Sequence, residues 1–251
     1  MPRPLQALHA LARELDPELV VVTGDLSHRG RRAELEHAAG ILSSLERPFL
    51  VVPGNHDIPY TFPRRFTRTF TEWERVFTAV EPTYRSEWLF VAGLNSVRPW
   101  RQQAGAVREE QLERAATHLK TAPEGALTIV ALHHHLAAPP WRAKRKRPLA
   151  RRDAVLQSLA SAGAQLVVGG HVHQASVAER REFEVLEGGH RSLVLATAPG
   201  FGRPRPRRKG EAQGANVYEA DQGLLSVTTY AWNGSTLTEV ARRRFRAGSA
   251  L

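Results

Sequence analysis

The chain contains no cysteine among its 251 residues. This absence excludes disulfides, thiolate metal ligands and a cysteine nucleophile. No apolar run approaches the ~20 residues that a transmembrane helix requires. The N-terminal residues show neither the continuous apolar segment nor the small-residue cleavage site of a signal peptide. We therefore expect a cytoplasmic protein that does not span a membrane.

Positive charge is abundant, with a formal net charge of +10. Much of it lies in three segments, 142–152, 203–214 and 242–246. These are either solvated basic loops or surfaces that attract phosphate-bearing ligands, nucleic acid or membrane headgroups. Charge raises the local concentration of anions, but it does not identify the substrate.

The order of predicted elements indicates an α/β protein. Helices are expected at residues 5–16, 31–45, 64–80, 109–121 and 153–162. Continuous apolar strands, typical of a parallel sheet, are expected at 19–22, 48–52, 88–92, 127–132 and 165–168. Further strands at 177–186, 192–197, 216–220 and 224–232 follow without long helices, which favours an antiparallel second half. No linker divides the chain, so we expect a single domain over residues 1–251.

An aromatic stripe marks the expected helix 64–80. Phe66, Phe70, Trp73 and Phe77 recur at helical spacing. We interpret these rings as core packing rather than as a platform for stacking nucleic-acid bases.

Polar residues follow four of the apolar strands. They are Asp25, Asn55, His133, and the pair His171 and His173. Ligands of open α/β sheets bind beyond the carboxyl ends of the strands, so segments distant in sequence can meet there. Histidines at positions i and i+2 of an extended segment point to the same side. The sequence therefore predicts one site at this edge of the sheet.

The expected ligand set consists of oxygen and imidazole, without sulfur. It favours manganese, iron or zinc over magnesium or calcium. Asp25 has two carboxylate oxygens and can bridge two ions. His56, beside Asn55, is expected to face the substrate as a catalytic residue. Asp57 is expected to orient the His56 imidazole.

In their order along the chain, these motifs resemble those of the calcineurin-like metallophosphoesterases. They are GlyAsp at 24–25, GlyAsnHisAsp at 54–57, the histidine at 133 and GlyHisXHis at 170–173. The resemblance covers about residues 5–240. It implies a four-layer αββα sandwich with mixed sheets. GlyLeuAsnSer at 93–96 and the triple histidine at 133–135 add a similarity to the bacterial class III cyclic nucleotide phosphodiesterases.

The resemblance also implies roles for individual residues. Asp25 would bridge two metal ions, and His173 would belong to the second ion. Asn55, His133 and His171 would complete the first site. Asn55, His134 and His173 are also expected near the substrate. His134 or His135 remains an alternative to His133 as the ligand, and segment 142–152 is expected to arch over the mouth of the site.

One motif of that family is missing. Its first strand ends in AspXHis, which supplies ligands to the ion that His173 binds, but no AspXHis precedes Asp25. By this comparison the first strand is absent, and the site holds either two ions or only one. His28, three residues after Asp25, is either a substitute ligand or a solvated loop histidine.

The resemblance implies a hydrolase of small phosphoesters, with cyclic nucleotides among the candidate substrates. The expected reaction is phosphodiester hydrolysis by a metal-bound hydroxide at a dinuclear centre, assisted by His56. One alternative is a degenerate mononuclear protein that binds phosphorylated ligands with weak or no activity. A nucleic-acid-binding module using the basic segments is less favoured, because no base-reading motif is visible.

Overall fold

The computed structural model describes residues 3–101, 103–137, 146–183, 190–202, 211 and 213–246. The helices are α1 (Arg3–Leu15), α2 (Arg32–Ser43), α3 (Arg64–Thr67), α4 (Thr71–Phe77), α5 (Glu109–Leu119) and α6 (Arg152–Ser161). The first six strands are β1 (Val20–Val22), β2 (Phe49–Val51), β3 (Thr83–Arg85), β4 (Leu89–Gly93), β5 (Leu127–Ala131) and β6 (Leu166–Gly169). They are followed by β7 (Ser176–Phe183), β8 (His190–Thr197), β9 (Gly214–Asp221), β10 (Leu224–Trp232) and β11 (Leu237–Arg246).

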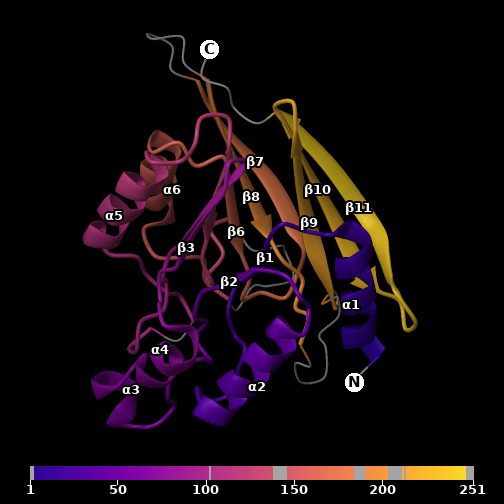
Figure 1. Cartoon of the computed structure of the whole chain (residues 1–251). Helices are drawn as coiled ribbons and strands as arrows, with labels where there is room; N and C mark the ends of the chain where they lie inside the picture. Colours follow the sequence, from indigo (N-terminus) through magenta and orange to yellow (C-terminus); the bar gives the residue numbers. More distant parts are fainter. Residues whose placement is uncertain are drawn as a thin grey trace.

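The larger sheet has six strands in the order β3-β4-β5-β6-β8-β7. Its centre, β4, β5, β6 and β8, is parallel, and the two edge strands are antiparallel to their neighbours. β5 and β6 are buried along their whole length, as expected for strands covered on both faces. Helices α5 and α6 cover one face of this sheet (Figure 1).

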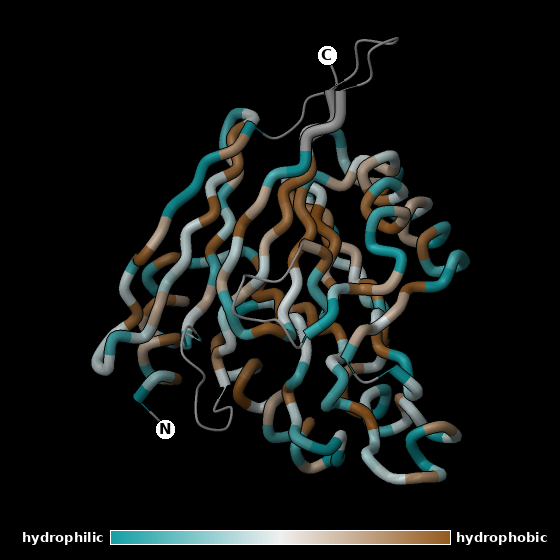
Figure 2. The backbone as a smooth tube through the Cα atoms, turned by 180° about the vertical axis from the view of Figure 1, so that it is seen from behind, coloured by the Kyte–Doolittle hydropathy of each residue, from teal (hydrophilic) through white to brown (hydrophobic). Residues whose placement is uncertain are grey.

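The second sheet layer consists of two separately hydrogen-bonded parts. β1 and β2 form a parallel pair, and β9, β10 and β11 form an antiparallel sheet. Side chains of both parts pack against the larger sheet in one apolar core, which includes Leu50, Val168 and Leu225. Figure 2 shows hydrophobic segments gathered in the strands at the centre of the molecule.

A further core lies beneath α1, α2 and α4, where Leu35 and Trp73 are fully buried against β1 and β2. With the core under α5 and α6, the layers run helix, sheet, sheet, helix (Figure 1). The expected αββα sandwich is confirmed. No helix within the described ranges is long and apolar enough to cross a membrane.

The predicted helix at 64–80 was wrong in its continuity. It is divided into α3 and α4, because Arg68 leaves the helical region, with φ −138° and ψ 44°. The hydroxyls of Thr67 and Thr69 bond back to carbonyls one turn earlier, a contact that competes with helix propagation. Trp73 is fully buried as predicted, but Phe66 is 51% exposed.

Two strands were not predicted. β3 is only three residues long, and β11 contains the basic segment 242–246, in which Arg243 pairs with Val227 of β10. Of the two alternatives for that segment, the solvated basic loop is wrong, because the segment forms part of a strand. Of the other basic segments, residues 142–145, 203–210 and 212 lie outside the described residues.

Candidate metal centre

The loops after β1 and β2 meet at one edge of the sandwich. A glycine is required in each loop, since the backbones lie too close for a side chain. A Cβ atom at Gly24, where φ is +85°, would lie 2.4 Å from the Gly54 nitrogen. A Cβ atom at Gly54 would lie 2.2 Å from the Asp25 nitrogen. Because the two backbones approach each other this closely, Asp25 and Asn55 lie at the same place.

Asp57 ties the two loops together. Its Oδ2 accepts hydrogen bonds from the backbone nitrogens of Asp25 (2.7 Å) and Gly54 (2.8 Å). Its Oδ1 accepts from the nitrogen and hydroxyl of Ser27. Burial and then the charge of Asp25 raise the pKa of Asp57 to about 7, while the bonds from Gly54 and Ser27 act in the opposite direction.

The prediction that Asp57 orients His56 was wrong. The Nδ1 of His56 instead lies 3.2 Å from the His28 carbonyl oxygen and 3.3 Å from the Tyr60 hydroxyl. The backbone N–H of His56 donates to Asp25 Oδ1 at 3.0 Å. The His28 ring stacks on the His56 ring, with centroids 5.9 Å apart. His28 therefore accompanies the predicted substrate-facing histidine on the exposed rim.

His133 presents a lone pair to the other predicted ligands. Its Nδ1 lies 2.7 Å from the carbonyl oxygen of Thr23, which can only accept, so Nδ1 carries the proton. The neutral ring then has an unprotonated Nε2. This atom lies 3.0 Å from Asn55 Oδ1, 3.0 Å from His171 Nδ1 and 3.5 Å from Asp25 Oδ2.

This arrangement fits a metal ion. The lone pairs of His133 Nε2 and Asn55 Oδ1 face each other, and a cation between them relieves their repulsion. Asn55 Nδ2 and His171 Nε2 are buried without a hydrogen-bond partner among the residues that the structure describes. Burial, followed by neighbouring positive groups, lowers the pKa of His171. Burial is also the main cause that lowers the pKa of His133. Both rings are therefore neutral, as metal binding requires.

His134 lies beside this group, fully buried. Its ring Nδ1 is 2.9 Å from the Ser96 hydroxyl, which also accepts the His134 backbone N–H at 3.2 Å. The ring packs against Gly105, where a Cβ atom would lie only 2.4 Å from Nδ1. Within the described part of the chain, the ligand atoms of His133, His134 and His171 lie within 4.8 Å of one another.

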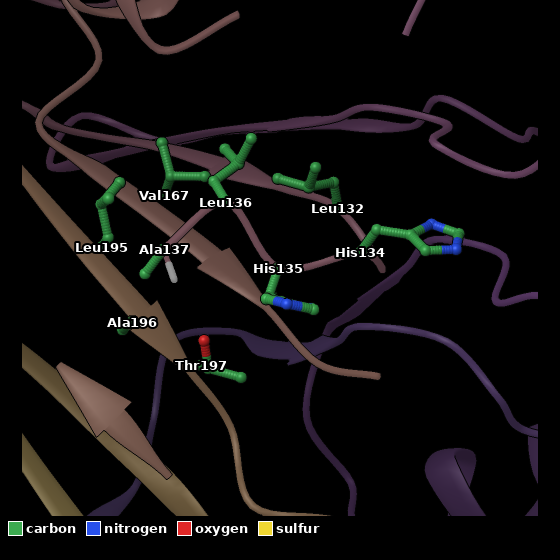
Figure 3. A pocket seen from close by; sticks show the side chains of 10 residues that line it. Leu132, His134, His135, Leu136, Ala137, Val167, Leu195, Ala196 and Thr197 are labelled. Carbon is green, nitrogen blue, oxygen red and sulfur yellow. The ribbon is translucent and has the colours of Figure 1, made fainter. Parts of the chain in front are cut away.

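His135 lines a small cavity together with Leu132, Leu136 and Thr197 (Figure 3). Within the described ranges, neither of its buried ring nitrogens has a hydrogen-bond partner. Burial, and then the charge of Lys146, lower its pKa to about 4. Of the three consecutive histidines, His133 is the one whose ring contacts the predicted ligands Asn55 and Asp25.

His173 is not part of that compact cluster. Its half-buried ring packs against Gly200, where a Cβ atom would lie 3.1 Å from the ring. Burial and then the charge of Lys146 lower its pKa, while Asp25 and Glu211 raise it. The structure therefore gathers the predicted ligands Asp25, Asn55, His133 and His171 and leaves His173 beside them.

Sequence reasoning assigned no individual role to Ser27, Ser96 or Lys146. The Lys146 ammonium donates to the backbone oxygen of His171. Lys146 lies in the basic segment expected near the mouth of the site, but no spacing rule distinguishes it from its basic neighbours. Ser96 ends the GlyLeuAsnSer motif, and its contact with His134 gives that motif a structural role.

Comparisons with known proteins show the family of the chain and its fold. The family model of the calcineurin-like phosphoesterases matches residues 2–175. A 3′,5′-cyclic adenosine monophosphate phosphodiesterase, CpdA, of Escherichia coli is 29% identical over 68% of this chain and 58% of that protein. A probable cyclic nucleotide phosphodiesterase of Synechococcus is 27% identical over 67% of this chain and 62% of that protein.

The matched part thus spans about three fifths of these relatives. Among solved structures, a dimetal phosphatase from Danio rerio shares the fold, with a TM-score of 0.62 at 14% identity, covering 97% of this chain and 88% of that one. Since the family model spans more than half of the residues, the chain belongs to the calcineurin-like phosphoesterase family.

Proposed function

We propose that the protein hydrolyses phosphodiesters with the help of divalent metal ions. The observation that carries this proposal is the meeting of Asp25, Asn55 and His171 around the unprotonated Nε2 of His133. These four residues would hold one ion. A second ion would lie between Asp25 and His173. Bound ions of this kind supply a Lewis acid and lower the pKa of water to give a nucleophile.

Other residues would contact the substrate or hold the ligand loops in place. His56 lies next to Asn55 and is linked to Asp25 through its backbone N–H, so its ring would meet the substrate at the rim. There it would stabilise negative charge or protonate the leaving oxygen. Asp57 would act by holding the loops of Asp25 and Gly54 together. His134, fixed by Ser96, would contact a phosphoryl oxygen through Nε2, which has no hydrogen-bond partner in the described part of the chain.

The relatives favour a small phosphodiester substrate. Two of them carry names that specify cyclic nucleotide hydrolysis. We therefore propose that 3′,5′-cyclic nucleotides and related phosphodiesters are the substrates to test first.

A second candidate is a mononuclear protein that binds phosphorylated ligands with little hydrolysis. It is favoured by the position of His173, which lies outside the compact histidine cluster of the described residues. Metal content separates the two proposals: the dinuclear hydrolase requires two ions per chain, and the mononuclear protein requires one.

Hydrolysis of bis-p-nitrophenyl phosphate and of 3′,5′-cyclic AMP, measured with added Mn²⁺, tests the main proposal. We expect turnover that disappears on chelation and returns with the metal. We expect His56→Ala to lower kcat by ~100-fold or more, the usual contribution of a positioned acid–base group, without changing Mn²⁺ binding. His118→Ala, on the exposed surface of α5, is the matched control. Unchanged turnover in both His56→Ala and Asp25→Ala would overturn the assignment.

A further inference from the structure

Lys146 brings a positive charge to the metal centre. Its Nζ donates to the backbone oxygen of His171, one of the four residues proposed to hold an ion. The chain just after it is fixed, since the Leu149 nitrogen donates to the His135 oxygen at 3.0 Å and the Leu149 side chain is buried. The ammonium is therefore held at the site by both its own bond and its backbone.

The other described basic residues of this segment are directed elsewhere. Arg151 pairs with Glu109 at 3.5 Å, and Arg152 pairs with Asp153 at 3.9 Å. Arg147 is exposed. Lys146 is thus distinguished from its neighbours by its contact with the centre, although they share its charge.

The ammonium lies against a residue that is proposed to hold an ion, through its bond to the His171 oxygen. Like charges repel, so an ammonium at this place opposes the binding of a metal ion. This cost requires a compensating benefit, and an anion that contacts both the ion and the ammonium provides one.

We propose that Lys146 binds a non-bridging oxygen of the substrate phosphoryl group, beside the metal ion. The proposal rests on the proposed function, because phosphoester hydrolysis places that group at the ion. A lysine is suited to this contact, since its ammonium is a compact charge with three donors. The ammonium already donates to the His171 oxygen, so a phosphoryl oxygen beside the ion would lie within reach of the same group. When the phosphoryl group develops charge, the ammonium stabilises it.

The test compares Lys146→Met with Arg147→Met, which removes a charge from the exposed neighbour. Mn²⁺ binding is measured by electron paramagnetic resonance. Inorganic phosphate binding to the Mn²⁺-loaded protein is measured by calorimetry, without turnover. For Lys146→Met we expect Mn²⁺ to bind several-fold more tightly, because a repulsive charge is lost. We expect phosphate to bind ~10- to 100-fold more weakly, because a charge-assisted hydrogen bond is lost.

The opposite signs separate this role from a structural one. If Lys146 only braced the loop, both ligands would bind more weakly, and the proposal would be overturned. Unchanged phosphate binding in Lys146→Met would also overturn it, as would equal effects in Arg147→Met. Lys146→Arg is expected to restore phosphate binding in part. If the Mn²⁺ and phosphate affinities shift in opposite directions but the protein shows no turnover, the role of Lys146 is supported and the proposed hydrolase activity is refuted.

Discussion

Replacing His133 with alanine is expected to lower Mn²⁺ affinity by at least ~100-fold and to abolish metal-dependent hydrolysis. Loss of an orienting partner of a ligand already costs about 10- to 100-fold, and His133 is proposed to be a ligand itself. Its Nε2 lies within 3.5 Å of atoms of Asn55, His171 and Asp25. The substitution therefore removes the atom around which the other proposed ligands meet. Metal content after dialysis and titration with Mn²⁺ would measure the effect.

The control for this experiment is His118→Ala, which removes an exposed imidazole from α5. It should bind Mn²⁺ like the unaltered protein. Circular dichroism of both variants would establish that the fold is retained. If folded His133→Ala kept full Mn²⁺ affinity, the ion would use different ligands, and His134 would be the first to examine.

The second large effect is expected for Gly24→Ala, which should lower the free energy of unfolding by roughly 3–5 kcal/mol. Two costs combine: a residue with a Cβ atom at φ +85° is strained, and the Cβ atom would lie 2.4 Å from the backbone nitrogen of Gly54. Forcing the loops apart would displace Asp25 and Asn55, so metal binding should weaken as well. Chemical denaturation followed by tryptophan fluorescence measures the stability.

Gly40→Ala is the matched control, because Gly40 lies in α2 and a Cβ atom there meets nothing within 4 Å. Alanine has the higher helix propensity, so this variant should be more stable by about 0.5–1 kcal/mol. If Gly24→Ala matched the stability of the unaltered protein, the close approach of the two loops would be wrong.

The location of the site was predictable from the sequence because parallel strands end at a common edge. Asp25, Asn55, His133 and His171 each follow an apolar strand. Backbone pairing places Asp25 beside Asn55 and His133 beside His171, and the packing of the two sheets brings these pairs together. The choice of His133 among three histidines rested on the same rule, since it comes soon after the end of β5.

The role of Asp57 was not predictable in this way. Its carboxylate binds backbone N–H groups of Asp25, Gly54 and Ser27, and every residue except proline carries such a group. No side-chain pattern therefore marks its partners. The contact of Lys146 with the His171 oxygen also involves a backbone atom, which explains why charge counting did not identify it.

The break in helix 64–80 has a different cause. The aromatic spacing correctly predicted the burial of Trp73, but it takes no account of the hydrogen bonds made by the hydroxyls of Thr67 and Thr69. These local bonds end the first short helix although the apolar period continues.

The division of the second sheet layer gives the metal centre a mechanical consequence. Asp25 and Asn55 follow β1 and β2, whereas His133 and His171 follow β5 and β6 of the other sheet. Hydrogen bonds of the strand ladders do not join β1 and β2 to the larger sheet in the described residues. An ion held by these four side chains would link the two sheet layers of the sandwich. Release of the ion and separation of the two sheets at this edge would then be coupled motions.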